Sequence, residues 1–338
     1  MTEHAPARLH GCWPAAMALA CSGCARQGNF LRPSGEGAEL IAMLTWATIV
    51  LSAVVSIVVI VLTAYAVLHR KEDVRDWTEE KDRPVIRWIV IGGAVVPGVL
   101  LLVLFVATML TLAGLAPMRA SGPLAIELTG RQWWWQVRYV NDSLPQLRFE
   151  SANEIHIPIG VRVPVRLTSV DVIHSFWVPE LQGKIDLIPG RTTHTWLHAE
   201  RPGVYQAKCA EYCGLQHTRM ELLVIAHAPD EFEAWLAHAS GPAVATSAGE
   251  PGLRVFLDAG CGLCHSIRGT PARAGIAPDL THVGARLELA AGTVPNTRGH
   301  MAGWIANPQA LKRGARMPRM RLTPEELHVL VDYLQRLE

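Results

Sequence analysis

The sequence has no excess of charge of one sign. Its 338 residues include 31 lysines and arginines against 30 aspartates and glutamates, so the formal net charge is +1 at pH 7. Proteins that bind nucleic acids usually present a strongly basic surface, so we expect no nucleic-acid partner. The length predicts two or three domains rather than one.

Cysteine is scarce and unevenly placed. Of the seven cysteines, three lie in the first 24 residues and four form two close pairs, Cys209 with Cys213 and Cys261 with Cys264. Histidine and methionine lie near these pairs. This pattern indicates metal or cofactor chemistry more than a disulfide framework.

Charge is absent from two long stretches, Leu40–Leu68 and Trp88–Met118. About 20 apolar residues cross the core of a bilayer, so the region 39–118 is predicted to hold two transmembrane helices, about 40–68 and 88–116. A buried core helix is the alternative, but such helices are rarely this long. Pro97 lies inside the second stretch, where a kink is tolerated.

Residues 1–24 are predicted to be an export signal. Arg8 is followed by a short apolar run, Ala15–Ala20, and then by small residues and cysteine. This order resembles a signal peptide. Ser22-Gly23-Cys24 also resembles the end of a bacterial lipoprotein box, although Cys21 stands where that box has leucine. An ordinary signal peptide cut nearby is the alternative.

The loop between the predicted spans is rich in basic residues, which mark cytoplasmic loops. These residues are Arg70, Lys71, Arg75, Lys81, Arg83 and Arg87. We therefore expect the N-terminus and everything after Met118 to lie outside, in agreement with the export signal. Two helices carrying a large outer region are typical of a tether, not of a channel or transporter.

The outer region begins with a segment, residues 122–240, that is predicted to form β structure. Val161–Leu167 alternates apolar and polar residues, and Pro164 within it predicts an edge strand. Further strands are predicted at Ala125–Thr129, Gln136–Val140, Thr193–Ala199 and Leu222–Ala226. This spacing favours a β-sandwich, closed by a short helix at Pro229–His238.

Residues 241–250 have the composition of a linker, and residues 251–338 are predicted to be helical. Thr323-Pro324-Glu325-Glu326 is a capping box with proline at the first helical position. An apolar stripe at helical spacing follows it: Leu327, Leu330, Val331, Leu334 and Leu337. The expected fold class is therefore multi-domain, with a two-helix transmembrane hairpin, an all-β sandwich and an all-α domain.

The stretch Cys209–Met220 contains four side chains that bind soft metals: two thiols, the imidazole of His217 and the thioether of Met220. A histidine and cysteine set with a weak methionine is typical of copper electron-transfer sites. Zinc is one alternative, but it has no use for the methionine. A disulfide between Cys209 and Cys213 is the other.

A second histidine, His174, lies in the run Asp171–Phe176, just after the alternating strand. With this run the chain resembles cytochrome c oxidase subunit II over residues 30–240. The matching motifs are Asp-Val-Ile-His-Ser-Phe, Lys184-Ile185-Asp186, Ile188-Pro189-Gly190-Arg191, Pro202-Gly203-Val204-Tyr205 and Cys-x-Glu-x-Cys-x-x-x-His-x-x-Met. Together these motifs are highly specific.

The resemblance implies a cupredoxin sandwich with a dinuclear copper A centre. The ligands that it implies are the bridging thiolates of Cys209 and Cys213, the imidazoles of His174 and His217, the thioether of Met220 and the carbonyl oxygen of Glu211. It further implies that the Glu211 carboxylate reaches a magnesium site at the interface with oxidase subunit I.

Gly130–Trp135 ends in three consecutive tryptophans, which cannot all point the same way on a strand. One or two of them are expected in the core, with the rest at the membrane interface. In the resembling family, electrons enter at the first aromatic residue of this block, above the copper. That position is Trp133.

Cys261-Gly262-Leu263-Cys264-His265 is the pattern for covalent attachment of a c-type haem. Cys261 and Cys264 would form the thioether bonds, and His265 would bind the iron. A redox-active pair of thioredoxin type is the alternative, but no βαβ pattern surrounds it. The region resembles a class I cytochrome c through Phe256, Ala277-Pro278-Asp279-Leu280 and Arg316-Met317-Pro318.

A methionine is expected opposite His265 on the haem iron. The family pattern places it directly before proline, at Met317. Pro318 favours an extended conformation for that residue, which suits a strap across the haem face. Met320, His328 and Met301 are the other candidates.

The resemblance implies a redox relay at the inner membrane of a bacterial cell, with both cofactor domains on the periplasmic side. Electrons would pass from haem c to copper A and on to an oxygen-reducing site in subunit I. Two spans without an intramembrane histidine cluster cannot hold that site. The expected partners are the membrane, subunits I and III, and a soluble or membrane-bound cytochrome c or other donor.

Three alternatives remain open. A quinol oxidase subunit has the same fold, but such relatives lack the copper ligands. A stand-alone tethered carrier or copper-handling protein would not co-purify with a multi-span subunit. Nitrous oxide reductase shares copper A, but this chain is too short for its propeller domain and shows no such repeats. The chain also lacks the glutamate that many members carry near the start of the second span, here Pro84–Trp88, at a proton-channel entrance.

Overall fold

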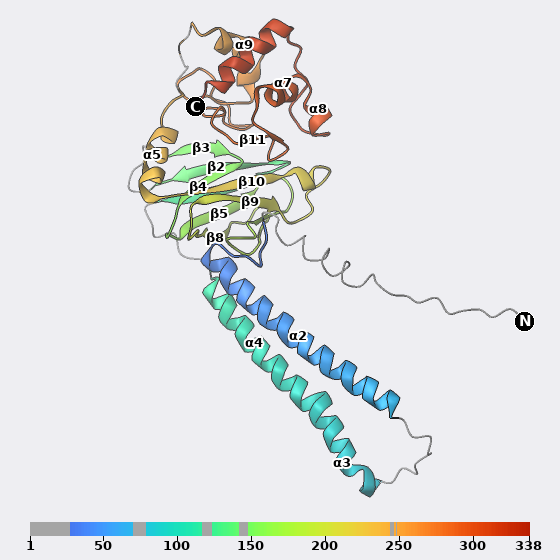
Figure 1. Ribbon diagram of the computed structural model, residues 1–338. Coiled ribbons are helices and arrows are strands. Elements are labelled where there is room, and N and C mark those ends of the chain that lie inside the picture. Colours follow the sequence, from blue (N-terminus) through green and yellow to red (C-terminus); the bar gives the residue numbers. More distant parts are fainter. Residues whose placement is uncertain (1–27, 70–78, 117–123, 142–147, 244–246, 248) are drawn as a thin grey trace, which may run out of the picture.

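The computed structural model describes residues 28–69, 79–116, 124–141, 148–243, 247 and 249–338. The predicted export signal, residues 1–24, lies outside these residues, as do Arg70, Lys71 and Arg75 of the basic loop. The described chain forms a helical hairpin, a β-sandwich and a mainly helical domain, stacked in that order (Figure 1). The predicted multi-domain fold class is therefore confirmed.

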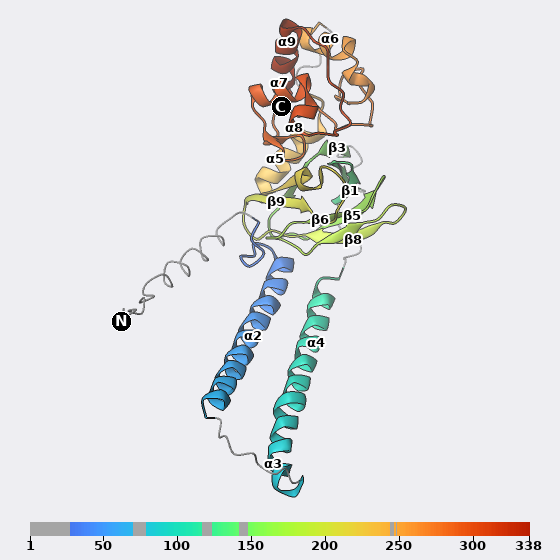
Figure 2. The ribbon, with the colours of Figure 1, turned by 90° about the vertical axis from the view of Figure 1, so that its right-hand side faces the viewer.

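The hairpin consists of α2 (Glu36–Leu68) and a second helical stretch made of α3 (Glu79–Val90), η2 (Ile91–Val95) and α4 (Val96–Gly114). Glu36–Leu68 and Arg83–Gly114, of 33 and 32 residues, are long and apolar enough to cross a membrane. They extend side by side away from the rest of the chain (Figures 1 and 2). Helical structure before the second span begins earlier than the predicted residue 88, so Pro84 lies inside a helix.

Pro97 follows a single π-helical turn, η2, and is the second residue of α4. Proline has no N–H to donate to the preceding turn, and its ring crowds the carbonyl four residues earlier. A π turn changes the hydrogen-bond register at such a gap. The second span therefore passes Pro97 through a widened turn and remains helical on both sides.

Two five-stranded sheets form the sandwich. The first has the order β3 (Phe149–Ala152), β2 (Trp134–Val140), β1 (Ala125–Arg131), β5 (Val163–Ser169), β8 (Thr193–Leu197). The second has the order β4 (Glu154–Pro158), β10 (Glu221–His227), β9 (Gly203–Cys209), β6 (His174–Trp177), β7 (Ile185–Leu187). Fully buried side chains from the two sheets form the core, among them Trp135, Tyr139, Ile155, Ile157 and Leu167.

The prediction that Pro164 marks an edge strand is wrong. β5 lies inside its sheet, between β1 and β8. The pairing with β1 begins only at Val165, which faces Ile126, while Pro164 pairs with Trp196 on the other side. Proline is tolerated because the pairing of β1 with β5 does not include Pro164, so no N–H is needed on that flank, which is locally an edge.

The beginning of α2 is attached to the sandwich. Arg162, in the turn before β5, forms an ion pair with Glu36, and its guanidinium carbon lies 4.5 Å from the centroid of the Trp196 ring. The backbone N–H of Ala38 donates to the carbonyl of Leu181 at 3.1 Å. These contacts hold the first span against the lower end of the sandwich.

A short helix, α5 (Pro229–Ser240), follows the sandwich as predicted. The C-terminal domain then contains α6 (Pro251–Asp258), η5 (Cys261–Leu263), β11 (Glu288–Leu289), β12 (Val294–Pro295), α7 (Arg298–Ala306), α8 (Pro308–Leu311) and α9 (Pro324–Gln335). The capping box is present, since Thr323 and Glu326 bond each other's backbone N–H groups. The two-stranded hairpin β11–β12 was not predicted for a domain expected to be all-α.

Candidate metal centre and haem site

The predicted metal ligands come together where β6, β9 and β10 meet. His174 begins β6, Cys209 ends β9, and His217 begins the short helix η4 (His217–Arg219) just before Met220 and β10. The Cys209 N–H donates to the Met220 carbonyl at 3.0 Å, and the Ala210 N–H donates to Ser175 at 2.8 Å. The loop that carries Cys213 is therefore held at both ends by the sheet.

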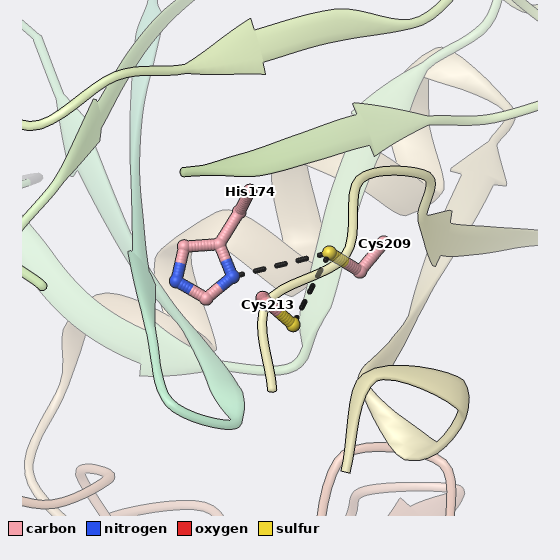
Figure 3. A group of neighbouring side chains, drawn as sticks. All are labelled: His174, Cys209 and Cys213. Carbon is pink, nitrogen blue, oxygen red and sulfur yellow. Dashed lines mark hydrogen bonds between the residues drawn. The ribbon is translucent and has the colours of Figure 1, made fainter. Parts of the chain in front are cut away.

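Two sulfur atoms lie at the middle of this group. The Sγ atoms of Cys209 and Cys213 are 3.7 Å apart, and both thiols are free. His174 Nδ1 lies 3.9 Å from Cys209 Sγ, as Figure 3 shows, and His217 Nδ1 lies 3.7 Å from Cys213 Sγ. Each thiol thus has one imidazole beside it.

Two weaker donors complete the set. Met220 Sδ lies 3.9 Å from Cys213 Sγ, and the Glu211 carbonyl oxygen lies 3.2 Å from Cys209 Sγ. His174 and Met220 are fully buried, and Cys213 is nearly so. Two thiols flanked on each side by one imidazole and one weak donor fit two soft metal ions that share the sulfurs.

The environment of the two thiols favours loss of a proton. The hydrogen bond with Cys213 lowers the pKa of Cys209 to about 3 and raises the pKa of Cys213, so without metal the pair shares one proton. Burial opposes charge on His174, but the hydrogen bonds to Cys209 and Asp171 outweigh it and raise the pKa of His174. A metal ion would meet one thiolate already formed.

Asp171 orients His174. One of its carboxylate oxygens lies 2.8 Å from His174 Nε2, while the other accepts the Gln132 N–H at 2.7 Å. Because Nε2 is held by the carboxylate, Nδ1 is directed to Cys209. The sequence motif contained Asp171, but this orienting role was not predicted.

Trp133 lies against the loop that carries Cys213. Its indole N–H donates to the Cys213 carbonyl at 3.0 Å, and the same oxygen accepts the Gln132 side-chain amide at 2.8 Å. Trp133 and Gln132 form the turn between β1 and β2, whereas Trp135 is buried in the core. The structure thus places Trp133 next to the candidate metal centre and Trp135 in the core.

Glu211 faces two environments. Its carbonyl lies beside Cys209, whereas its carboxylate is 3.5 Å from Lys184 Nζ, which is also 3.7 Å from Asp186. This side chain is 44% exposed, so it is accessible to a neighbouring chain.

The predicted haem-binding residues lie on η5 and the turn that follows. Cys261 and Cys264 are free thiols. His265 Nδ1 bonds the Pro278 carbonyl at 2.7 Å, which leaves Nε2 available for iron. Burial lowers the pKa of His265, so the imidazole remains neutral as an iron ligand requires. The Ala277–Leu280 motif therefore positions this histidine, and the residues fit a covalently bound haem.

The candidates for the second axial ligand differ in environment. Met317 and Met320 are both partly buried against the core of the haem domain. Met301 is almost fully buried on α7, and His328 lies on the exposed side of α9. Met317 and Met320 therefore lie in similar environments, in the segment that leads to α9.

Lys312 is a buried residue that the sequence analysis missed. The residue is only 3% exposed. Its ammonium group donates to the carbonyl oxygens of Trp133, Arg219 and Ala290 at 2.6–2.8 Å. Burial lowers the pKa of Lys312 to about 7, while three acceptors favour the ammonium, which alone offers three N–H groups. A lysine at a helix end normally projects into solvent, so no sequence signal marked it.

Comparison with known proteins gives matches to both domains. Residues 124–227 match the family described as cytochrome c oxidase subunit II, periplasmic domain, and residues 249–338 match cytochrome c. The chain is 34% identical over 337 residues to cytochrome c oxidase subunit 2 of Alkalihalophilus pseudofirmus, covering 95% of each chain. It is 26% identical over 343 residues to the Bacillus subtilis protein of the same name, again covering 95% of each.

A quinol oxidase also matches. The chain is 27% identical over 234 residues to quinol oxidase subunit 2 of Bacillus cereus, covering 68% of this chain and 79% of that protein.

Proposed function

The chain belongs to the cytochrome c oxidase subunit II family and carries a cytochrome c domain, and from this we propose that it passes electrons from haem c to a dinuclear copper A centre and on to subunit I. It is a subunit of an oxidoreductase, and the oxygen-reducing site lies on another chain. The two apolar helices anchor it in a membrane, with the sandwich and haem domain on the periplasmic side. We assign it to the inner membrane of a bacterial cell.

The symmetric distribution of donors around Cys209 and Cys213 is the observation that carries the proposal. The imidazole of His174 stands beside one sulfur and that of His217 beside the other. A single zinc ion would use one set of four donors around one point. Four donors spread around two sulfurs, six in all, support two copper ions that would share the two thiolates.

Bound copper A would supply one electron shared between two metals, and bound haem c would supply a second one-electron carrier. The protein contributes rigidity and exclusion of water. His174, Cys213 and Met220 are buried, and the loop is bonded to β6 and closed by the hydrogen bond between Cys209 and Met220. Ligands that are held still rearrange little when an electron arrives, so the barrier to transfer stays low.

Trp133 is proposed as the residue through which electrons reach copper A. The hydrogen bond from its indole to the Cys213 carbonyl supports this role, because Cys213 would itself bind both metals. On the haem side, Cys261 and Cys264 would hold the haem ring. His265 would bind the iron, and Met317 would be the second protein ligand of the iron.

The proposed partners are oxidase subunits I and III and a cytochrome c or another electron donor. The exposed Glu211 carboxylate supports a contact with subunit I, where it would bind magnesium. Because the Glu211 carbonyl lies beside Cys209, one residue would connect this interface with copper A.

A quinol oxidase subunit is the second candidate, favoured by the Bacillus cereus relative. A protein that receives electrons from quinol would not need the copper site, yet all six of its donors are gathered here. A stand-alone carrier would be distinguished by purification without a multi-span subunit.

Metal and haem analysis of the purified full chain tests the proposal. We expect two coppers and one haem per chain, with a mixed-valence spectrum from one shared electron. Cys213→Ser should lose the dinuclear copper and keep the haem, because a hydroxyl cannot replace a bridging thiolate. Tyr212→Phe is the matched control, since Tyr212 is next to Cys213 in the chain and its side chain is exposed. One copper per chain, or zinc retained in preference to copper, would contradict the proposal.

The direction of transfer is tested by rapid reduction of haem c. Electrons should then appear at copper A, and Trp133→Ala should slow their arrival without changing the copper spectrum. Trp134→Ala controls for general packing damage, because Trp134 lies on the adjoining strand. Equal rates in the wild-type chain and Trp133→Ala would reject the role of Trp133.

A further inference from the structure

A four-residue segment of the haem domain, Leu311–Gly314, lies directly on the loops of the candidate copper centre. We call it the docking segment. Arg219 donates a hydrogen bond to the Leu311 carbonyl, and Gln216 Nε2 donates to the Arg313 carbonyl at 2.6 Å. Both donors belong to the loop between Cys213 and Met220, so the docking segment contacts the part of the sandwich that carries three of the proposed ligands.

Lys312 makes the central contact of this segment. Its ammonium bonds Trp133 O at 2.8 Å and Arg219 O at 2.6 Å on the copper side, and Ala290 O at 2.7 Å in its own domain. One group therefore joins the proposed site of electron arrival, the residue before Met220 and the haem domain.

The chemistry of this site is unusual for a contact that only buries surface. A lysine sealed from water needs compensation, and here none of its three acceptors is a carboxylate. Neutral carbonyls satisfy the N–H groups and define directions, because all three donors are used. The main effect of the buried Lys312 ammonium is therefore to fix its three acceptors in one arrangement. Its contribution to the stability of the protein is secondary.

The same segment is connected to the haem side. Gln309 accepts the Gly314 N–H at 2.7 Å and donates to the Ala315 carbonyl at 2.8 Å, two residues before Met317. Gly314 has a positive φ of 86°, and a Cβ there would lie 3.0 Å from Leu215 and 3.7 Å from the Trp133 ring. The backbone therefore approaches Trp133 closely just before the proposed axial strap.

From these contacts we propose that Lys312 is a positioning residue, which holds the docking segment on Trp133 so that haem c and copper A exchange electrons in one fixed arrangement. The inference rests on the proposed function. If the arrangement is fixed, the haem domain does not have to move before an electron is transferred. The rate of transfer therefore does not depend on solvent viscosity.

Further contacts join the two domains, one of them beside Ala290, where the Glu221 N–H donates to the Ala291 carbonyl at 3.1 Å. Two others lie away from the docking segment. The Leu287 N–H donates to Glu154 at 2.7 Å, and Arg268 donates to the Ala239 carbonyl at 2.6 Å. Loss of the lysine contact should therefore leave the domains attached and loosen the docking segment alone. The separation between haem c and Trp133 would then vary, and transfer would wait for closure.

The test is the rate of electron transfer from haem c to copper A in the full chain after rapid reduction of the haem. Lys312→Met has nearly the length of lysine and removes all three donors. We expect a rate lower by about tenfold or more, because small displacements of reacting groups are costly, together with a new dependence on viscosity. Arg254→Met removes one charge from an exposed position on α6 and should behave as the wild-type chain.

Both reduction potentials are measured in each variant, since loss of a positive charge near copper changes the driving force. Transfer in Lys312→Met as fast as in the wild-type chain, or a slower rate fully accounted for by the potentials, overturns the proposal. A variant that is only less stable would unfold at lower temperature and show no viscosity dependence.

A second variant covers a failure of Lys312→Met to fold with its cofactors. Gln216→Ala removes the hydrogen bond to the Arg313 carbonyl and leaves the lysine in place. It should show a smaller loss of rate with the same viscosity dependence, and a wild-type rate would overturn the proposal. Absence of haem-to-copper transfer in the wild-type chain would instead refute the proposed function itself.

Discussion

The carbonyl oxygen of Cys213 accepts two hydrogen bonds from the turn between β1 and β2, one from Trp133 and one from Gln132. A substitution at Trp133 therefore removes an aromatic ring and also a contact that shapes the metal loop. Trp133→Phe keeps an aromatic ring but loses the indole N–H that bonds the Cys213 carbonyl, so its comparison with Trp133→Ala separates the ring from the hydrogen bond.

The identity of the second haem ligand is also decided by single residues. Met317 precedes Pro318, which favours an extended backbone across the haem face, and Met320 lies on the same apolar cluster. We expect Met317→Ala to lose the methionine–haem band near the red end of the oxidised spectrum and Met320→Ala to keep it. The opposite result would move the ligand to Met320.

His227 introduces a pH dependence outside the cofactor sites. Its Nε2 lies 2.8 Å from His156 Nδ1, and burial, followed by the nearby His156, lowers the pKa of His227 from its ordinary value of 6.5. Glu231 acts in the opposite direction, and Glu154 lies 3.7 Å from His156. The unfolded chain therefore binds this proton more readily than the folded chain.

The sign of the effect follows from this difference in proton binding. As the pH falls below 6.5, the unfolded state gains a proton first, so the free energy of unfolding decreases until the pH passes the lowered pKa of the folded state. In thermal unfolding between about pH 5 and 7, His227→Gln should lose stability less steeply on acidification than the wild-type chain. Parallel curves for the two proteins would show that His227 contributes nothing.

At the scale of elements, α9 depends on its N-terminal cap. Thr323 Oγ1 accepts the Glu326 N–H at 3.2 Å, and the Glu326 carboxylate accepts the Thr323 N–H at 2.8 Å. The helix packs on the haem-domain core through Leu330, Val331 and Leu334. Fraying of its first turn would therefore weaken that domain.

We expect Thr323→Ala to destabilise the haem domain by about 1 kcal/mol, the usual value of such a cap. For a domain of this size that lowers the unfolding midpoint by roughly 4–8 °C. Thr323→Ser keeps the acceptor and should unfold close to the wild-type temperature. An unchanged midpoint in Thr323→Ala would mean that packing alone holds the helix.

The strands that carry the proposed metal ligands were harder to predict from the sequence than other strands of the sandwich. Strands with clear alternation or turn boundaries, such as β1 and β10, were predicted within two residues at each end. The strands β6 and β9 were not predicted, although β6 begins at His174 and β9 ends at Cys209. Strands of this kind are defined by pairing with distant partners more than by their own pattern.

In the whole molecule, the haem domain, the sandwich and the membrane hairpin are stacked, with the haem domain farthest from the hairpin (Figures 1 and 2). This order agrees with the proposed direction of electron flow. An external donor would meet the haem domain, while the docking segment lies over Trp133. Under the proposed role of Trp133, the fused domain occupies the place where a separate electron donor would bind.

The sequence by itself determined the features that depend on neighbouring residues. Two uncharged stretches predicted the spans, the Cys-x-x-Cys-His motif predicted the haem attachment, and the clustered thiols, histidine and methionine predicted the copper chemistry. Local patterns are sufficient for these features because span length, cofactor attachment and ligand type are properties of short segments.

Only the tertiary structure decided which distant residues meet. It placed β5 inside its sheet despite Pro164, brought Trp133 to the Cys213 carbonyl, and buried Lys312 against Trp133. Trp133 and Lys312 are separated by 179 positions in the chain, and the lysine is buried because two domains close over it. No local pattern records such a contact, since it arises from the packing of complete domains.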